Sequence, residues 1–257
     1  MTAVLSVTDI SRQFGGLQAL SDVAFTTVPG EIFGIIGPNG AGKTTLFNVI
    51  TGAFPPSTGK VVFEGTPVAG LSMDKVARMG LVRTFQATSV FRSQSVFENL
   101  RRGAMFSLLG RPSFLLRAKA TVTAGAVARK RAEEIIDFLD LGAVTTNRAG
   151  DLAYGLQKIL GVGMALAAAP KMLLMDEPAA GLNPTETAAL GKLLLRVRGE
   201  WKIDIVVVEH DMQMIMSICD RIMVLNYGRV ICLDTPSQVR ADPAVIEAYL
   251  GTDDELA

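Results

Sequence analysis

Glycine, lysine and threonine are concentrated in one short segment of the chain. It consists of Gly37, Pro38, Asn39, Gly40, Ala41, Gly42, Lys43, Thr44 and Thr45. Because glycine has no Cβ, consecutive backbone N–H groups in such a segment can turn inward around phosphate oxygens. Lys43 would then reach the terminal phosphates, and the Thr44 hydroxyl would coordinate Mg²⁺. The pattern predicts a site for a nucleoside triphosphate.

Two adjacent carboxylates follow an apolar run further along the chain. The run Met172 to Met175 leads directly into Asp176 and Glu177. Taken alone, an apolar strand that ends in Asp-Glu is common at ordinary turns. Downstream of a phosphate loop, it supplies the acidic element that phosphoryl transfer needs. We expect Asp176 on the metal side and Glu177 to polarise the attacking water.

Two more side chains could take part in this chemistry. His210 is the only histidine and follows the run Ile203 to Val208. A lone histidine is usually structural, but the carboxyl end of a parallel sheet is where α/β folds bind ligands, so contact with a γ-phosphate is expected. Gln86 ends the stretch Leu81 to Phe85 and is either an exposed amide or a sensor of the metal or the water.

The elements that must position these residues follow from an alternation of short and long patterns. Short β-branched runs bounded by glycine or proline alternate with longer apolar-periodic stretches, which predicts an α/β fold with a parallel sheet. The expected strands are Leu5 to Asp9, Val23 to Val28, Ile32 to Ile36, Val61 to Phe63, Met172 to Met175, Ile203 to Val208, Ile222 to Leu225 and Val230 to Leu233. The expected helices include Thr45 to Ile50, Val96 to Met105, Val127 to Leu141 and Pro243 to Leu250.

Composition excludes several classes of function. The chain has 257 residues, and its 25 basic and 25 acidic residues give no formal net charge, which disfavours nucleic acid as a partner. The longest apolar run, Ile159 to Ala169, is too short to span a bilayer. The N-terminus has no secretory pattern, so we expect a cytosolic protein. Cys219 and Cys232 fit no metal spacing and are expected to be small buried hydrophobes.

One stretch of the predicted helical region is strongly basic. Between Leu100 and Arg131 there is no acidic residue, whereas the basic residues are Arg101, Arg102, Arg111, Arg117, Lys119, Arg129, Lys130 and Arg131. Such a stretch is either a solvated helical face or a surface held near anionic lipid headgroups or an acidic partner loop. The sequence leaves both interpretations open.

The motifs together resemble a known family. The segments GPNGAGKTT, RTF followed by Gln86, LAYGLQ, LLMDEP and AAGLN, and then His210, have the order seen in nucleotide-binding subunits of ABC transporters. The resemblance covers essentially the whole chain. The segments FGGLQAL, SVFENL, DEPAAGLNPTET and DPAVIEAYLG are similar to the ATP-binding subunit of branched-chain amino acid importers.

The resemblance implies a fold and further site residues. It implies a P-loop NTPase (RecA-like) core formed by residues 1–87 and 159–257, with an N-terminal antiparallel β subdomain, and a helical insertion at residues 88–158. Phe14 would stack on adenine, and Gln86 would bind the metal and couple it to the insertion. A signature segment, with Ala153, Tyr154, Gly155 and Leu156, would bind the γ-phosphate of ATP on the opposite subunit. Gly181, Leu182 and Asn183 would form a loop across the dimer interface.

The resemblance also implies partners and a location. The chain would bind ATP and Mg²⁺, pair head to tail with an identical or related ATPase subunit, and drive two integral membrane permease subunits. A periplasmic or extracellular solute-binding protein would take part indirectly. The chain would therefore be cytoplasmic and peripheral on the inner face of the membrane.

The signature segment departs from the general pattern of the family. Ala153 stands where serine is usual, Tyr154 replaces the first glycine, and Leu156 replaces a glutamine, while Asn183 replaces an aspartate in the interface loop. Each lost charge-assisted hydrogen bond would cost about 1.5 to 3 kcal/mol. Gly155 and the start of the following helix can still bind phosphate through backbone N–H groups.

Three other functions are alternatives to an importing ATPase, and one further alternative concerns only the solute. A GTPase switch needs an Asn-Lys-x-Asp base reader, and no asparagine here precedes a lysine. A non-transport ABC protein acting on DNA or ribosomes is disfavoured by the neutral charge. A regulatory subunit that binds ATP but hydrolyses it poorly would explain Ala153 and Leu156. Amides or urea are the alternative solutes.

Overall fold

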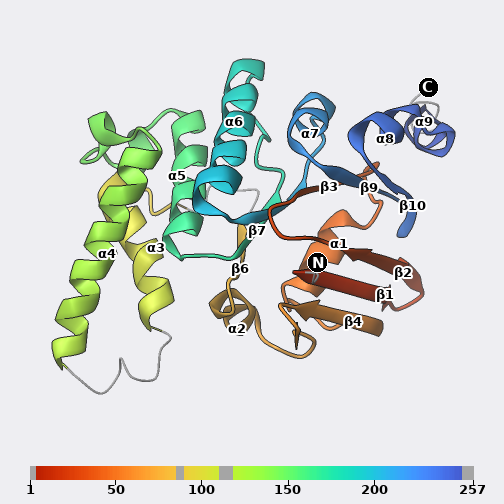
Figure 1. The fold of residues 1–257 in the computed structure, drawn as a ribbon, viewed down its shortest axis with the longest axis horizontal. Coiled ribbons are helices and arrows are strands. Elements are labelled where there is room, and N and C mark those ends of the chain that lie inside the picture. The colour runs from red at the N-terminus through yellow and green to blue at the C-terminus, as the bar shows by residue number, and fades with distance from the viewer. Residues whose placement is uncertain (1–3, 85–89, 110–117, 251–257) are drawn as a thin grey trace.

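The chain folds as α/β with two sheets, and the computed structural model describes residues 4–84, 90–109 and 118–250 (Figure 1). The strands are β1 (Leu5–Phe14), β2 (Leu17–Thr26), β3 (Ile32–Ile36), β4 (Thr58–Phe63), β5 (Thr66–Pro67), β6 (Leu81–Thr84), β7 (Met172–Asp176), β8 (Asp204–Val208), β9 (Arg221–Asn226) and β10 (Arg229–Asp234). The helices are α1 (Lys43–Ile50), α2 (Met73–Arg78), α3 (Val96–Leu109), α4 (Ala118–Phe138), α5 (Tyr154–Ala167), α6 (Pro184–Trp201), α7 (Met212–Ile218), α8 (Pro236–Ala241) and α9 (Pro243–Leu250), with short 3-10 turns at Gly142–Val144 and Ala149–Asp151.

The larger sheet has six strands in the order β10-β9-β3-β8-β7-β6. Strands β9, β3, β8, β7 and β6 are parallel, and β10 joins the edge antiparallel. Every residue of β3, β7 and β8 is buried, as the continuous apolar runs of the sequence predict for parallel strands covered on both faces. The predicted α/β class and P-loop NTPase core are confirmed.

Alternate residues of the parallel strands pack into two separate cores. Ile205 and Val207 of β8 face one core, which also contains Leu166 of α5 and Leu194 of α6. Val206 and Val208 face the other core together with α1 and the antiparallel sheet. Helix α1 therefore lies between the two sheets, while α5, α6 and α7 cover the opposite face of the larger sheet (Figure 1).

The smaller sheet is antiparallel, in the order β2-β1-β4-β5, as expected for the N-terminal third. The predicted first strand, Leu5 to Asp9, was too short, because β1 continues through Phe14. Asp9 adopts a left-handed conformation with φ 50°, and the register with β2 shifts between Val7 and Ile10. A bulge therefore absorbs the break in alternation, and pairing resumes beyond it.

Helices α3, α4 and α5 pack together at the end of the molecule opposite α9 (Figure 1). The predicted end of α4 at Leu141 was too late. The chain leaves the helix near Asp140, which has φ 56°, and the Leu141 N–H closes the end on Ile136 O at 2.9 Å. Helix α5 runs without a break through residue 158, where the sequence placed the end of the helical insertion.

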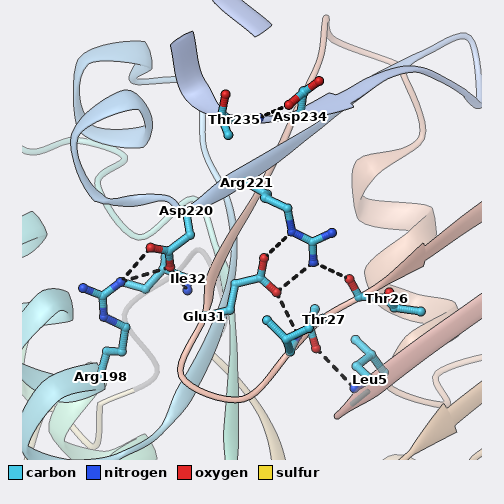
Figure 2. Close-up of polar contacts among 11 residues, drawn as sticks. Leu5, Thr26, Thr27, Glu31, Ile32, Arg198, Asp220, Arg221, Asp234 and Thr235 are labelled. Carbon is cyan, nitrogen blue, oxygen red and sulfur yellow. Dashed lines mark hydrogen bonds and ion pairs between the residues drawn. The ribbon is translucent and has the colours of Figure 1, made fainter. Parts of the chain in front are cut away.

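A buried carboxylate fastens the two sheets to each other. Glu31, just before β3, receives hydrogen bonds from Arg221 Nε at 2.6 Å and Nη2 at 3.0 Å, and Arg221 Nη2 also donates to Thr26 O at 2.8 Å (Figure 2). Asp220 beside it accepts from the Ile32 N–H at 2.8 Å and pairs with Arg198. The hydrogen bonds that Arg221 donates to Glu31 raise the pKa of Arg221 above its usual range. This network fixes the strand that leads into the phosphate loop.

The two cysteines have different surroundings. Cys219 is buried, and burial raises the pKa of its thiol. Cys232 is only half-buried, and burial together with a contact to Asp242 raises its pKa to about 11. The expectation of a buried hydrophobic side chain is therefore met in full by Cys219 and only in part by Cys232. Among the helices of the described ranges, none is both long and apolar enough to cross a bilayer.

Candidate functional site

The predicted phosphate loop connects β3 to α1, the strand-to-helix context that its function requires. Gly37, Gly40 and Gly42 have φ values of 150°, 78° and 103°. A Cβ on Gly37 would lie 2.0 Å from Leu225 O, and one on Gly42 would lie 2.8 Å from Ala19 O. The loop is thus wedged between β2 and β9, and at Gly37 and Gly42 only glycine fits.

Lys43 is folded back over its own loop. Its Nζ donates to Gly37 O at 2.6 Å and to Pro38 O at 2.9 Å. Burial lowers the pKa of Lys43 below its usual value, and the nearby charges of Glu177 and Asp176 oppose this shift. The ammonium is therefore within electrostatic range of both acidic residues.

A cavity of about 400 Å³ is lined by ten of the predicted site residues, and Gly37, Pro38 and Asp176 are not among them. Its lining comes from the β1–β2 turn, the phosphate loop, the ends of β7 and β8, and the β9–β10 turn. The residues are Phe14, Leu17, Gln18, Ala19, Asn39, Gly40, Ala41, Gly42, Lys43, Thr44, Thr45, Glu177, His210, Tyr227 and Gly228. Residues far apart in the sequence thus surround one space.

Glu177 and His210 meet at the carboxyl ends of two paired strands. β7 and β8 are parallel neighbours, and His210 Nε2 lies 2.7 Å from Glu177 Oε1. Glu177 has φ 48°, an uncommon conformation for a residue with a side chain, and its N–H is bound to Val208 O at 2.8 Å. The backbone strain and the cross-strand hydrogen bond together hold the carboxylate in the cavity.

Asp176 pairs with Arg83, a partner that was not predicted from the sequence. Its Oδ2 lies 2.5 Å from Arg83 Nη2, and the two side chains are only 10% and 7% exposed. Arg83 Nη1 also donates to Asn48 Oδ1 of α1 at 2.6 Å. The Asp176 carboxylate and the Thr44 hydroxyl are hard oxygen donors, the type that Mg²⁺ prefers, so the donor set fits this metal. Within the described residues no cluster of three acidic, histidine or cysteine side chains forms a metal cage.

Phe14 and Gln86 stand differently in the structure. Phe14 is 41% exposed at the mouth of the cavity. Its ring lies edge-on to Phe54, with centroids 5.3 Å apart, and the Arg12 guanidinium lies 4.6 Å from its centroid. One ring face is therefore supported by a cation, which suits a platform for a base. Gln86 lies outside the described residues.

The signature segment and the interface loop lie next to each other, and neither contributes to the described lining of the cavity. Tyr154 Oη donates to Ala180 O at 3.3 Å, and a Cβ on Gly181 would meet the Tyr154 ring at 2.9 Å. Ala153 is the N-cap of α5 and forms no side-chain cap, and Leu156 packs against the core. Asn183 caps α6 through a reciprocal pair of hydrogen bonds with Glu186, both 3.0 Å long.

Three residues with clear geometric roles were missed from the sequence. Arg83 holds Asp176, and Tyr227 lines the cavity with φ 44° and 83% exposure. Glu209 is 3% exposed and accepts from the N–H groups of Ala179 and His210, so it ties the loops after β7 and β8 together. The Glu209-His210 dipeptide after an apolar strand is a sequence signal that could have identified Glu209, whereas no local pattern marks Arg83.

Tyr249 also contacts the phosphate loop. It is hydrogen-bonded to the Gly37 backbone, and burial raises the pKa of its hydroxyl.

The parallel sheet, the loop after β3 and the acidic residue after β7 define a P-loop nucleoside triphosphatase of the ATP-binding cassette type. A family model for ABC transporters matches residues 20–180, and a model for branched-chain amino acid ATP-binding cassette transporters matches residues 229–255. The chain belongs to the ABC transporter family.

Individual relatives agree along the whole chain. The high-affinity branched-chain amino acid transport ATP-binding protein LivG of Escherichia coli (strain K12) is 41% identical over 256 residues, which cover 96% of this chain and 98% of LivG. BraF of Pseudomonas aeruginosa, with the same description, is 38% identical over 252 residues, with coverage of 96% and 98%. The ADP conformation of MJ1267, an ATP-binding cassette of an ABC transporter, superimposes with a TM-score of 0.83 at 29% identity, covering 98% of this chain and 100% of that one. The predicted resemblance is confirmed.

Proposed function

We propose that the chain is the ATP-binding and ATP-hydrolysing motor subunit of an importer for branched-chain amino acids. The observation that carries the proposal is the single cavity that Lys43, Thr44, Glu177 and His210 share. The solute is inferred from what LivG and BraF are described as transporting. An importer of amides or urea is the alternative, because the solute would contact other subunits.

ATP binding would use the backbone of the phosphate loop first. Residues of the loop and of the start of α1 line the cavity, so their backbone N–H groups would supply hydrogen bonds and a helix dipole to the phosphates. Lys43 would exchange the carbonyls of Gly37 and Pro38 for terminal phosphate oxygens. Phe14, supported by Arg12, would stack on adenine.

The metal would be held by Thr44 and Asp176, with Gln86 as a third contact. When bound, Mg²⁺ neutralises charge that develops on the β- and γ-phosphates. Thr44, in the first turn of α1, lines the cavity, and Asp176 ends β7 directly before Glu177, which also lines it.

Hydrolysis would depend on the pair Glu177 and His210. Glu177, held by His210, would accept a proton from the attacking water and orient it towards the γ-phosphate. His210 holds Glu177 Oε1 through Nε2 and is itself in the cavity, so it would also contact the γ-phosphate.

A complete site would need two subunits. Each chain carries one phosphate loop and one signature segment, and these do not share the cavity. In a head-to-tail dimer, Gly155 and the first turn of α5 would bind the γ-phosphate held by the opposite subunit. Ala153 and Leu156 offer that phosphate no side-chain hydrogen bond. Gly181, Leu182 and Asn183 would cross the interface.

Membrane coupling would run through the helical region. A cavity of about 380 Å³, mostly apolar, lies between α2, α3, α5 and β6, and its lining includes Met73, Phe106 and Met164. Two integral membrane permease subunits would contact this region, with Gln86 as the hinge and a solute-binding protein acting through them. The chain would be cytoplasmic and peripheral on the inner face of the membrane.

A second candidate function is a regulatory subunit that binds ATP but hydrolyses it poorly. Ala153 and Leu156 favour it, because Ala153 gives α5 no side-chain cap and Leu156 packs against the core. These positions would weaken the site on the opposite subunit, while this chain's own Lys43 and Glu177 keep their geometry.

ATP turnover and ATP-dependent dimerisation of the wild type and of Glu177→Gln test the proposal. If the chain is a motor subunit, the wild type should hydrolyse ATP. The Glu177→Gln variant should lose turnover and should form an ATP-dependent dimer, which light scattering detects. The exposed substitution Glu200→Gln is the control and should behave as the wild type. If the wild type and Glu177→Gln both bind ATP but remain inactive monomers, the regulatory function is favoured. If the wild type does not bind ATP, both the motor function and the regulatory function are contradicted.

A further inference from the structure

Arg83 joins three elements that surround the proposed metal site. It lies on β6, opposite Leu174 in the parallel register with β7, and its side chain reaches forward to Asp176. The Nη2–Oδ2 distance is 2.5 Å, and both side chains are largely excluded from solvent. A charge-assisted hydrogen bond at this depth fixes the orientation of the carboxylate.

The second terminal nitrogen of the same guanidinium is bound to α1. Nη1 donates to Asn48 Oδ1 at 2.6 Å, and the guanidinium carbon lies 5.6 Å from the centroid of the Phe47 ring. Asn48 is four residues after Thr44, so the two lie one turn apart on the same face of α1. Arg83 therefore links the helix that carries Thr44 to the strand that carries Asp176.

The contact leaves one oxygen of the carboxylate out of the ion pair. Arg83 engages Oδ2 only, and a carboxylate has two oxygens with about four lone-pair directions. Oδ1 would thus be available to the metal site while Oδ2 remains on Arg83. The planar fork of arginine bridges two acceptors in fixed geometry, which a lysine ammonium or a neutral amide cannot reproduce.

We propose that Arg83 is a positioning residue for the metal site, which holds Asp176 and α1 in register so that Asp176 and Thr44 can share one hydrated Mg²⁺. The proposal rests on the proposed function, because it assumes that the cavity binds MgATP. Arg83 is not part of the lining of the cavity that would hold the nucleotide. Its loss should therefore change the dependence on Mg²⁺ and leave metal-free binding of ATP intact.

The experiment measures ATP binding to the full chain by calorimetry, in EDTA and over a series of free Mg²⁺ concentrations. For Arg83→Gln and Arg83→Lys we expect an ATP Kd in EDTA within about twofold of the wild type. The Mg²⁺ concentration that gives half of the metal-dependent gain in affinity should rise about tenfold, equivalent to about 1.4 kcal/mol. Asn48→Ala removes only the hydrogen bond between Arg83 and Asn48. It should raise the same Mg²⁺ concentration by a smaller factor.

Matched variants separate the possible outcomes. Arg78→Gln removes an equal charge from an exposed position on α2 and should leave the Mg²⁺ dependence unchanged. An unchanged or lower Mg²⁺ requirement in Arg83→Gln would overturn the proposal, as would an equal loss of affinity in EDTA. If Arg83→Gln does not fold, Asn48→Ala decides by the same criteria. A wild type that binds no ATP, or whose ATP binding ignores Mg²⁺, would instead contradict the proposed function.

Discussion

Glu177 Oε1 and His210 Nε2 lie 2.7 Å apart, joined across two neighbouring parallel strands that end at the same edge of the sheet. Neither residue is near the other in sequence. The pairing of β7 with β8 places them together, and Glu209 holds the loops that follow both strands. The position of Glu177 in the cavity is therefore set by the sheet and by its histidine partner together.

Replacement of His210 tests this dependence. For His210→Ala we expect ATP turnover to fall about 100-fold, because Glu177 loses the group that orients it, a typical size for a general acid–base contribution. ATP affinity should change only a few-fold. Steady-state turnover and calorimetry measure the two effects. His210→Gln keeps a hydrogen-bond donor and should retain more activity than His210→Ala, and equal activity of all three proteins would contradict the assignment.

Leu156→Gln tests whether the signature segment acts on the opposite subunit. The substitution restores a polar side chain in the first turn of α5, and a regained charge-assisted hydrogen bond of about 1.5 kcal/mol corresponds to roughly tenfold in turnover. We expect faster hydrolysis in the assembled dimer and no change in the ATP affinity of the monomer. Turnover as a function of protein concentration separates the two. Tighter ATP binding by the monomer would show that Leu156 acts within its own chain.

Local chemistry makes parts of the fold predictable from the sequence. The bounds of the strand Ile32 to Ile36 were right, because the apolar run ends at Gly37, a position where only glycine fits. Features that depend on contacts between distant segments were not predicted. The bulge at Asp9 depends on pairing with β2 and β4, and the partner of Asp176 is an arginine on β6, 93 residues away. Neither relationship leaves a periodic signal in the sequence.

The ion pair of Arg221 and Glu31 should contribute strongly to stability. The Glu31 side chain is 2% exposed, so Arg221→Met would leave a buried carboxylate without its cation. Such a change costs about 3 to 5 kcal/mol, and the partial exposure of Arg221 favours the lower value. Urea unfolding measures the difference. Arg129→Met, which breaks an exposed pair with Glu133, should cost less than about 1 kcal/mol, and similar losses for both variants would contradict the argument.

Asp204 should give the folding free energy a specific dependence on pH. It begins β8, and its carboxylate accepts the Gly30 N–H at 2.5 Å. Burial raises the pKa of Asp204 in the folded protein, and the negative charges of Glu31 and Glu64 act in the same direction. In the unfolded chain the pKa returns to about 3.9. The folded state therefore binds the proton more tightly, so this contribution to stability is fully present below about pH 4 and is lost as pH rises through the raised pKa.

Asp204→Asn removes that titration and isolates its effect. We expect the free energy of unfolding of the variant, minus that of the wild type, to increase from pH 4 upward and to level off above the raised pKa, because an amide has no charge to bury. Urea unfolding from pH 4 to pH 8 gives this difference, in which the other titrating groups cancel. Asp140→Asn makes the same chemical change at a side chain that is 88% exposed, so its difference should stay flat. A flat or falling difference for Asp204→Asn would show that its charge is well solvated in the folded protein.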